Sequence, residues 1–510
     1  MSQHFDVAVV GTQLSGIIAA ALLAKRGRRV VLVDHGEQTN AYRRNGFRLP
    51  LVPTLVPNLD DSPPAKLVHQ ELALGPQLRA KLETPATSFQ AVMPGHRIDV
   101  RSTPDAWLGE LKLEFPELVD QVRDFFTRLI EIDSEISAFL AKQPKLLSTG
   151  FFEGFKVRRE LAEMEHLDVP FEDHPIFQSI PTDHPIRELL LGPLSFFGNL
   201  SAQSPSAFHA IRLIARYYRG TVSFTDRLFD MADIFVKAAE EAGVNVRRGA
   251  LVKMITPKGA TLHEIELADG RHTFTADFFI DNASSPFEEL LPQGKAQAKL
   301  AAERSVLRPV GSLMVLNILA KREVVPNGMA ESVFLLNGRQ RQRGAEPADP
   351  PLFLRRYPAQ RVDSQLNRRV DDDAHVVFSV ACPVRTSEVS RSPARFQALR
   401  AQMASRVARL VPFLNEFIVD QSMASDTASW DADTDMTRTI DPWALHPIYE
   451  PAERPVLGIA IKREKGYFKN LVRCGRDVIP GLGLEGEYVA ALAAVDEVTD
   501  RAGSAWKPRI

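Results

Sequence analysis

The sequence contains few cysteines and carries almost no net charge. Cys382 and Cys474 are its two cysteines, and they lie far apart with neither metal-ligand nor redox-motif spacing. This rules out a disulfide-stapled fold and predicts a protein of a reducing compartment, the cytoplasm. The formal net charge is −2, from 62 Lys and Arg against 64 Asp and Glu. Bulk charge therefore attracts neither nucleic acid nor an anionic membrane, and we expect no nucleic-acid partner.

Long hydrophobic runs and several catalytic motifs are also missing. The longest stretch without Asp, Glu, Lys or Arg runs from Leu189 to Ile211 and is interrupted by glycines and prolines, so we expect no transmembrane helix. Without a Ser-His-Asp order, a metal-ligand spacing or a P-loop, the sequence supports neither hydrolysis nor phosphoryl transfer, and it predicts no metal site and no nameable catalytic residue. Tyrosine (7) and tryptophan (4) are scarce beside 29 phenylalanines. This excess indicates either an apolar tunnel or an ordinary core.

The strongest positive signal lies near the N-terminus. The valine-rich runs Phe5–Val10 and Val30–Val33 are typical of strands buried on both faces, and the Ala- and Leu-rich segment Gly16–Lys25 between them predicts a helix. Gly11 begins the turn into that helix, and Asp34 ends the second strand. The order predicts a βαβ unit that binds a dinucleotide, with the helix N-terminus at the pyrophosphate and the acid at a ribose.

One position departs from the dinucleotide fingerprint G-x-G-x-x-G. The chain has in its place Gly11, Thr12, Gln13, Leu14, Ser15 and Gly16. The middle glycine normally lets the backbone approach the pyrophosphate, so the Gln13 side chain must turn aside if a dinucleotide binds. Two interpretations stay open: a dinucleotide site, or a βαβ unit that kept its shape and lost its ligand.

The length of 510 residues predicts two or three structural units. Residues 60–220 have mostly helical periodicity, with a long amphipathic helix expected from Glu117 to Leu140. After residue 225 come a helix, a hairpin with an Asp-Gly turn and a buried strand, Ala276–Ile280, which would extend the N-terminal parallel sheet. Residues 290–455 alternate strands with helices. A glycine-rich loop that begins at Cys474 then leads into a final helix, a second place suited to an anion or a polar ring.

Five shorter segments carry local predictions. The tetrapeptide Asp-His-Pro-Ile occurs at 173–176 and again at 183–186, and we interpret both copies as helix caps rather than as a metal site. Segments 337–351 and 425–436 are polar and are predicted to be exposed loops. Val456–Ile461 is a strand candidate.

Several of these segments together resemble one family. The βαβ unit, the segment from Gly46 to Leu55 (GFRLPLVPTL), the region 227–285 and the stretch Cys474–Val495 are similar to the phytoene desaturase and carotenoid isomerase branch of the FAD-dependent, amine-oxidase-like flavoproteins. The resemblance implies an α/β fold, a split Rossmann-like FAD-binding domain of the GR2 type with an inserted mixed α+β substrate domain that includes a helical subdomain. The implied division is an FAD-binding domain of residues 1–70, 221–290 and 455–505, a helical insert of 71–220 facing substrate or membrane, and a β-sheet substrate domain of 291–454.

The resemblance also implies contacts with FAD. Asp34 would bind the adenosine ribose, and Val252 would lie beside the adenine. Asp477 would meet the ribityl chain or the pyrophosphate, while Pro480 and Gly481 would pass near the flavin ring. The full set of implied cofactor-binding residues is Gly11, Gln13, Leu14, Ser15, Gly16, Asp34, His35, Arg43, Arg44, Pro53, Thr54, Val252, Asn282, Gly475, Asp477, Pro480, Gly481 and Leu482.

The chain departs from the family's pattern beyond the fingerprint. The Gly-Gly-Arg that follows the ribose acid is missing, so Arg43 or Arg44 would serve as the phosphate partner instead. The closing loop has Arg-Asp-Val-Ile where the family has His-Pro-Gly-Gly. Glu485 and Glu487 lie at the start of the last helix. They would either compete with a reduced, anionic flavin for the helix dipole or act as favourable residues of a first turn.

The activity implied by the resemblance is that of an FAD-dependent oxidoreductase acting on a long hydrophobic substrate, isoprenoid or carotenoid-like. The reaction would be desaturation, with hydride transfer to flavin N5. Because such a substrate resides in membranes, we expect peripheral attachment through an apolar patch, on the inner face of the membrane. The alternatives are a redox-neutral isomerase, an oxidase of another apolar or amine substrate, and a binding or scaffold protein that has lost FAD. No pattern predicts the oligomeric state.

Overall fold

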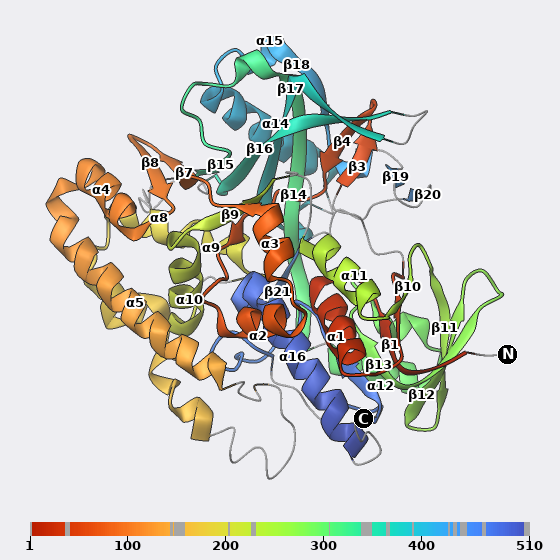
Figure 1. Ribbon diagram of the computed structural model, residues 1–510. Coiled ribbons are helices and arrows are strands. Elements are labelled where there is room, and N and C mark those ends of the chain that lie inside the picture. The colour runs from red at the N-terminus through yellow and green to blue at the C-terminus, as the bar shows by residue number, and fades with distance from the viewer. Residues whose placement is uncertain are drawn as a thin grey trace.

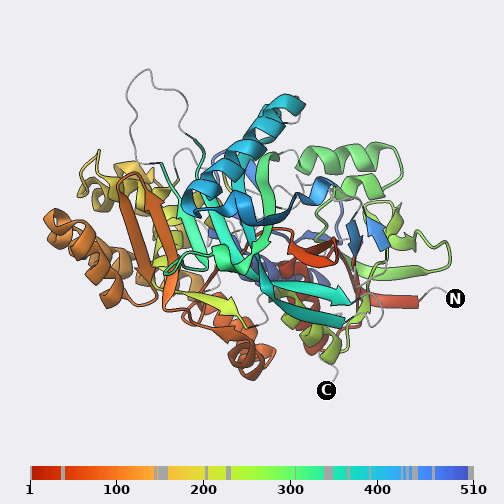
Figure 2. The same ribbon diagram turned by 90° about the horizontal axis from the view of Figure 1, so that it is seen from above.

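The computed structural model describes most of the chain, namely residues 3–35, 41–142, 146, 159–201, 205–225, 231–304, 306–337, 349–363, 368–389, 392–426, 429–431, 436–438, 446–461 and 466–503. Two large sheets and a helical lobe make up this part (Figure 1). Seen from above, the helical lobe and the hairpin of the first sheet lie at opposite ends, with the second sheet between them (Figure 2).

The first sheet joins segments that are far apart in the sequence. Its strand order is β10-β2-β1-β13-β12-β11, and β22 pairs with β13. Five strands run parallel: β1 (Gln3–Val10), β2 (Val30–Val33), β10 (Asn245–Arg247), β13 (Thr273–Asp281) and β22 (Leu471–Arg473). β11 (Val252–Lys258) and β12 (Thr261–Leu267) form an antiparallel hairpin at one edge. The start, middle and end of the chain thus share one sheet, which confirms the predicted split Rossmann-like fold.

Three helices pack together beside this sheet. α1 (Leu14–Lys25) contacts both α11 (Met231–Glu241) and α16 (Gly483–Ala502). All residues of α1 from Leu14 to Ala24 are buried. A helix that is apolar on every side must lie inside the protein, and this explains the Ala- and Leu-rich composition that predicted it. α12 (Lys295–Arg304) contributes Leu300 to a separate apolar cluster with β1, β11, β12 and β13.

The second sheet contains ten strands, most of them antiparallel. Its main order is β18-β14-β17-β16-β15-β7-β8, with β21 beside β14 and the pair β3–β4 beside β16. The strands are β3 (Ala41–Arg44), β4 (Phe47–Pro50), β7 (Thr87–Met93), β8 (His96–Arg101), β14 (Leu307–Lys321), β15 (Ser332–Leu335), β16 (Leu352–Asp363), β17 (Arg368–Arg385), β18 (Ile418–Ser422) and β21 (Pro447–Pro451). α13 (Thr386–Val389), α14 (Pro393–Leu410) and α15 (Leu414–Phe417) follow β17. β3 and β4 belong to this sheet, although they fall within the range 1–70 assigned to the FAD-binding domain, and the domain boundaries stay a prediction.

Helices form the lobe at the other end of the molecule. They are α4 (Pro104–Glu114), α5 (Val119–Ala141), α7 (Pro175–Gln178), α8 (Pro185–Leu191), α9 (Leu194–Phe197) and α10 (Ala207–Tyr218). The helix expected from Glu117 to Leu140 is confirmed as α5. α2 (Pro63–Glu71) and α3 (Gly75–Lys81) lead toward this lobe, and a small sheet of β5 (Val56–Pro57), β9 (Thr221–Phe224) and β6 (Leu82–Glu83) lies beside it.

The two Asp-His-Pro-Ile copies do begin helices, but histidine is the capping residue. The Nδ1 of His174 accepts a hydrogen bond from the Ile176 amide at the start of α7, and the Nδ1 of His184 accepts one from the Ile186 amide at the start of α8. The proline that follows each histidine lacks an N–H, so the next free amide is the one that the imidazole reaches. The helix-cap interpretation is therefore confirmed.

Three other local predictions have different outcomes. Val456–Ile461 is a turn with a single bridge between Val456 and Ala460, so the predicted strand is wrong. The predicted loop 425–436 overlaps a short hairpin of β19 (Ser429–Asp431) and β20 (Met436–Arg438). Most of the predicted loop 337–351 lies outside the described residues. In the described part of the chain, no helix combines the length and the apolar character needed to cross a bilayer.

Candidate functional site

A cavity of about 970 Å³ lies where the first sheet, the second sheet and the helical lobe meet. One end is polar and is lined by the β1–α1 turn and by the loop between β22 and α16. The other end is lined by aromatic side chains from α9, α10, β15 and β16. The volume is at the upper end of the range for small-molecule sites, so the cavity has room for a large ligand.

The fingerprint glycines lie against β13 and not against the cavity. A Cβ on Gly11, which has a φ of +102°, would lie 2.3 Å from the Asn282 carbonyl oxygen, and a Cβ on Gly16 would lie 2.1 Å from the Asn282 Oδ1. The buried Asn282 amide donates to the Ser15 hydroxyl at 3.1 Å and to the Cys474 carbonyl at 2.7 Å. These residues therefore join α1 to β13 and β22. The implied contact of Gly16 with a pyrophosphate has no counterpart in the lining of the cavity.

The N-terminus of α1 already has an anionic partner within the chain. The Ser15 amide donates to the Glu487 Oε2 at 3.1 Å, and the Glu487 Oε1 lies 3.3 Å from the Arg476 Nε. Glu487 is 4% exposed. Gln13 lies beside this pair, where its Oε1 accepts a hydrogen bond from the Arg476 amide at 3.4 Å. Of the predicted fingerprint residues, Gln13 and Leu14 line the cavity.

The residues assigned to the adenosine also bond to one another. The Asp34 Oδ2 accepts a hydrogen bond from the Gly249 amide at 2.9 Å, and the His35 Nδ1 accepts one from the Val252 amide at 3.1 Å. Burial lowers the pKa of His35, so its ring stays neutral and accepts this bond. His35 lines the cavity, whereas Asp34 and Val252 are not part of its lining.

The arginines proposed as replacement phosphate partners point elsewhere. Arg43 donates to the Val362 carbonyl, and Arg44 pairs with Asp420 at 2.8 Å, both within the second sheet. Neither lines the cavity, and their role as phosphate partners stays a prediction. The cavity is lined instead by four arginines that sequence reasoning did not select: Arg304, Arg308, Arg473 and Arg476.

Three of these four arginines are paired with carboxylates. Arg304 lies 2.7 Å from Asp281, Arg473 pairs with Asp477, and Arg476 pairs with Glu487. Burial by itself would raise the pKa of Asp477, but the charges of Arg473 and Arg304 outweigh it and hold the pKa below its usual range. Asp477 lines the cavity as an ionised carboxylate. Its implied contact with the ribityl chain or the pyrophosphate of FAD stays a prediction. The positive charge of the arginines at the polar end is thus largely neutralised by carboxylates of the chain itself.

The remaining predicted residues divide into two groups. Pro53 and Thr54 line the cavity, and the carbonyl of Thr54 accepts a hydrogen bond from Arg355. Gly475, Pro480, Gly481 and Leu482 do not line it. A Cβ on Gly481 would lie 2.5 Å from the Ile459 Cα, so that glycine is needed for close packing of the closing loop. Gly483 and Leu484, the first residues of α16, line the cavity in their place.

The aromatic end consists of side chains that no sequence motif connects. Phe197 and Tyr217 stack with ring centroids 3.5 Å apart, and Phe334 and Phe353 stack at 4.7 Å. Phe196 lies against the second pair, 5.5 Å from Phe334 and 6.0 Å from Phe353. All five line the cavity. The excess of phenylalanine was the only sequence signal for this surface, and it did not distinguish these residues from the rest of the core.

The cavity is also lined by a half-buried histidine, His446. Burial, together with the nearby Arg476, lowers the pKa of His446 to about 3. Its Nε2 lies 3.4 Å from the Asn199 amide nitrogen, and both residues line the cavity. A histidine with this pKa is neutral at physiological pH. It is suited to orienting a ligand by hydrogen bonding and not to donating a proton as an imidazolium.

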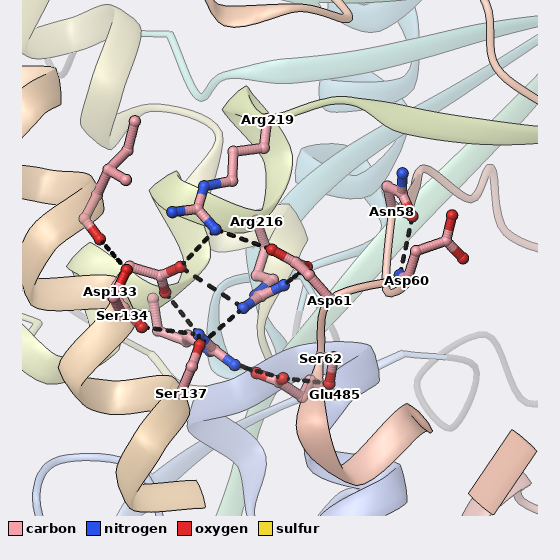
Figure 3. Close-up of polar contacts among 12 residues, drawn as sticks. Asn58, Asp60, Asp61, Ser62, Asp133, Ser134, Ser137, Arg216, Arg219 and Glu485 are labelled. Carbon is pink, nitrogen blue, oxygen red and sulfur yellow. Dashed lines mark hydrogen bonds and ion pairs between the residues drawn. The ribbon is translucent and has the colours of Figure 1, made fainter. Parts of the chain in front are cut away.

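The acidic residues at the start of α16 have separate partners. Glu485 lies 2.6 Å from Arg212 of α10. It also accepts a hydrogen bond from Ser62 at 2.5 Å (Figure 3). Burial would raise the pKa of Glu485, but the charge of Arg212 outweighs it and lowers the pKa. Glu485 therefore faces the helical lobe, and it is Glu487 that faces the cavity.

The Arg212–Glu485 pair is a buried part of a larger cluster of charges. Arg212 also pairs with Asp133 at 2.6 Å, and Asp133 lies 3.1 Å from Arg219. Arg216 and Arg219 both contact Asp61, which precedes α2 (Figure 3). Three arginines thus face three carboxylates, so the cluster has no net charge. It joins α2, α5, α10 and α16 behind the cavity.

One group of side chains has the spacing of metal ligands. His4, Asp6 and Asp277 have ligand atoms within 4.8 Å of one another, and no other such group occurs in the described residues. Asp6 binds Arg29, His4 contacts Thr275, and two of the three residues are exposed. The group therefore does not amount to a metal site.

Comparison with known sequences points to a dinucleotide-type domain. Residues 9–72 match the family model of an NAD(P)-binding Rossmann-like domain. The prolycopene isomerase of Daucus carota is 20% identical over 332 residues, 64% of this chain and 54% of that protein. The corresponding protein of Arabidopsis thaliana is 21% identical over 330 residues, 63% of this chain and 55% of that protein. The chain thus spans about half the length of these curated relatives.

Comparison with solved structures covers nearly the whole chain. A double mutant of putrescine oxidase, from a redesign of cofactor binding, has a TM-score of 0.56 at 15% identity and covers 98% of this chain and 99% of its own. Cyclohexylamine oxidase from Brevibacterium oxydans has a TM-score of 0.50 at 13% identity, covering 97% and 98%. The chain shares the overall fold of these two oxidases. At these identities the likeness shows the fold, and it confirms the predicted fold class and the resemblance on which it rested.

The amine-oxidase fold implies FAD, whose diphosphate would have to meet the N-terminus of α1. That place does not fit a diphosphate in this structure. The Ser15 amide is hydrogen-bonded to Glu487. Arg476 contacts Gln13 through its backbone amide and Glu487 through its guanidinium. Two negative charges would have to enter beside a buried carboxylate, which is unfavourable at low dielectric. The aromatic end, in contrast, fits an apolar chain or ring.

Proposed function

We propose that this protein binds a long apolar molecule, isoprenoid or carotenoid-like, in the aromatic end of the cavity and converts it in a redox-neutral isomerisation. The observation that carries the proposal is the cluster of Phe196, Phe197, Tyr217, Phe334 and Phe353 at one end of a cavity of about 970 Å³. Aromatic faces bury large apolar areas and impose a defined orientation on a flat, conjugated chain.

The arrangement of charges at the polar end of the cavity supports the redox-neutral reaction. Isomerisation needs no net transfer of electrons, so it does not depend on a diphosphate at α1, where Glu487 is bound. The polar groups near the aromatic end, Asn199 and His446, are uncharged. They suit a neutral ligand. The curated relatives named prolycopene isomerases support the same reaction class.

A second candidate is FAD-dependent desaturation of the same class of ligand. The overall fold favours it, because the neighbouring solved structures are amine-oxidase-type enzymes. It requires the polar end to rearrange before a dinucleotide can enter. The predicted cofactor residues, from Gly11 to Leu482, stay a prediction under this candidate.

Two measurements on the full chain test these candidates. The first is extraction of the purified protein with organic solvent, followed by mass spectrometry, in which we expect a co-purified polyene or isoprenoid. The second is incubation of flavin-free protein with a poly-cis polyene under anaerobic conditions. We expect the absorption spectrum to shift toward the all-trans form. Formation of a product with additional double bonds, and only when FAD is added, would favour desaturation and overturn the isomerase.

Peripheral membrane contact stays a prediction. The most exposed large apolar side chains among the described residues are Leu113, at 81%, and Phe413, at 71%. Leu113 belongs to α4 in the helical lobe, whereas Phe413 precedes α15 at the second sheet (Figure 1). Single apolar residues at separate places do not make a membrane-binding surface.

A further inference from the structure

We propose that Glu487 is a built-in substitute for the diphosphate of a dinucleotide, and that the cradle at α1 is closed by the chain itself. The inference concerns the polar end of the cavity only. It does not depend on which apolar ligand occupies the aromatic end.

The first support is the convergence of two helix N-termini. α1 begins at Leu14 and α16 at Gly483, and the two helices pack against each other. The contact between Ser15 and Glu487 brings the first turn of α1 beside the second turn of α16, so the positive ends of both helix dipoles face a common region. The N-cap residue of α1, Gln13, makes no side-chain cap. A carboxylate from the second turn of α16 provides the missing acceptor.

The second support is that both oxygens of this carboxylate are used. The Glu487 Oε2 accepts from the Ser15 amide at 3.1 Å, and its Oε1 lies 3.3 Å from the Arg476 Nε. One backbone amide and one arginine are the usual partners of a phosphate group. Glu487 is buried and lines the cavity, so it meets these partners at the place that a ligand would reach.

The third support is the side chain that replaces the middle glycine. The Gln13 Oε1 accepts from the Arg476 amide at 3.4 Å, and its Nε2 lies 3.5 Å from the Ser284 hydroxyl. Arg476 is therefore held through its backbone by Gln13 and through its side chain by Glu487. Gln13, Arg476 and Glu487 thus form one connected group that fills the space between the β1–α1 turn and the closing loop. Gln13, in place of the middle glycine, and Glu487 thus both disfavour binding of a diphosphate.

The neighbouring acid shows that this placement is specific. Glu485 is in the same helix, yet its charge is neutralised by Arg212 on the side of the helical lobe. Among the cavity-lining residues of α16, which are Gly483, Leu484 and Glu487, only Glu487 is a carboxylate. Its removal would leave the Ser15 amide and the Arg476 guanidinium available to an anion.

Binding of FAD and of ADP to the full-length protein tests the inference. FAD binding is followed by flavin fluorescence and ADP binding by calorimetry, so that the diphosphate is tested with and without a flavin ring. We expect no saturable binding to the wild type at ligand concentrations where Glu487→Ala, Glu487→Gln and Gln13→Gly bind both. The double variant Glu487→Ala/Gln13→Gly should bind most tightly. The affinity should rise about tenfold or more when the charge is removed.

Controls make the outcomes decisive. Glu487→Gln preserves the size of the side chain, so a gain in this variant reports on charge even if Glu487→Ala folds poorly. Glu497→Ala removes a carboxylate from the same helix about 15 Å farther along and should bind no better than the wild type. The proposal is overturned if the wild type holds FAD as tightly as the Glu487 variants, or if no variant gains affinity for ADP. Neither result would alter the test of the apolar ligand.

Discussion

The guanidinium of Arg212 lies 2.6 Å from the carboxylate of Glu485, and both side chains are almost completely buried. This pair joins α10 of the helical lobe to α16 beside the first sheet. The same guanidinium lies 2.6 Å from Asp133 of α5. One arginine thus links α5, α10 and α16.

Replacement of Arg212 should destabilise the protein strongly. Arg212→Leu leaves Glu485 and Asp133 buried with fewer cationic partners, which costs about 3–5 kcal/mol. The measurement is the shift in the urea midpoint of unfolding. Arg123→Ala is the control, since Arg123 pairs with Asp120 on the surface and should contribute about 0–0.5 kcal/mol. A shift no larger than that of the control would show that the cluster is not needed for stability.

Two glycine-to-alanine changes should have opposite effects. A Cβ on Gly16 would lie 2.1 Å from the Asn282 Oδ1, so Gly16→Ala forces α1 away from β13 and should cost about 1–3 kcal/mol. Gly109 lies exposed in α4 with nothing near its Cβ position, and Gly109→Ala should stabilise by about 0.5–1 kcal/mol. Thermal unfolding of both variants checks the sign. A neutral Gly16→Ala would mean that the contact with Asn282 is looser than it is here.

A charge in the aromatic end should reduce binding of apolar ligands. Phe196 lines the cavity and is only partly buried, so Phe196→Asp can fold while placing a carboxylate beside the ligand. We expect the affinity for a fluorescent polyene fatty acid to fall roughly tenfold or more, because the charge loses solvation when the ligand binds. Leu113→Asp, on the exposed surface of α4, should leave the affinity unchanged. Equal affinities of the two variants would place the apolar site elsewhere.

Stability should fall as the pH is lowered from about 6.5 toward 4. Burial lowers the pKa of His69 and of His209 to about 4, and burial with Arg476 lowers that of His446 to about 3. Within this window the unfolded chain binds protons that the folded chain does not, and the unfolded state is therefore favoured as pH falls. Above about 6.5 these histidines are neutral in both states and contribute nothing.

Thermal unfolding at pH 7 and pH 5 measures this dependence. We expect a lower midpoint at pH 5 in the wild type and a smaller difference in His209→Gln, which lacks one of the buried groups. His4→Gln is the control, because His4 is exposed at the edge of the fold. An unfolding midpoint that is equal at both pH values would show that the pKa values of these histidines are not lowered in the folded protein.

The elements of the first sheet were largely predictable from local pattern. Phe5–Val10 and Val30–Val33 are buried strands because their apolar side chains leave no face for solvent, and α1 is helical and fully buried for the same reason. The Asp269-Gly270 turn places β12 beside β13, as expected. The strand predicted at Val456–Ile461 failed, because an apolar run alone does not distinguish a strand from a buried turn.

The site was less predictable, because its residues meet only in three dimensions. The position of Arg43 and Arg44 after Asp34 favoured a phosphate contact. Both belong to β3, which pairs with β4 in the second sheet. Pairing between strands distant in sequence decides this, and no local signal reports it. The aromatic end likewise combines side chains from α9, α10, β15 and β16.

The sequence by itself determined the βαβ unit, since this unit follows from runs of apolar residues and from glycines at fixed spacing. The split arrangement of the first sheet came from the resemblance to a known family. Only the tertiary structure decided which acid faces which cation. Glu485 and Glu487 are two residues apart on one helix, so their side chains leave the helix axis in directions about 200° apart, one toward Arg212 and the other toward Ser15 and Arg476. The partners of both acids come from distant segments, and it is this packing that closes the cradle.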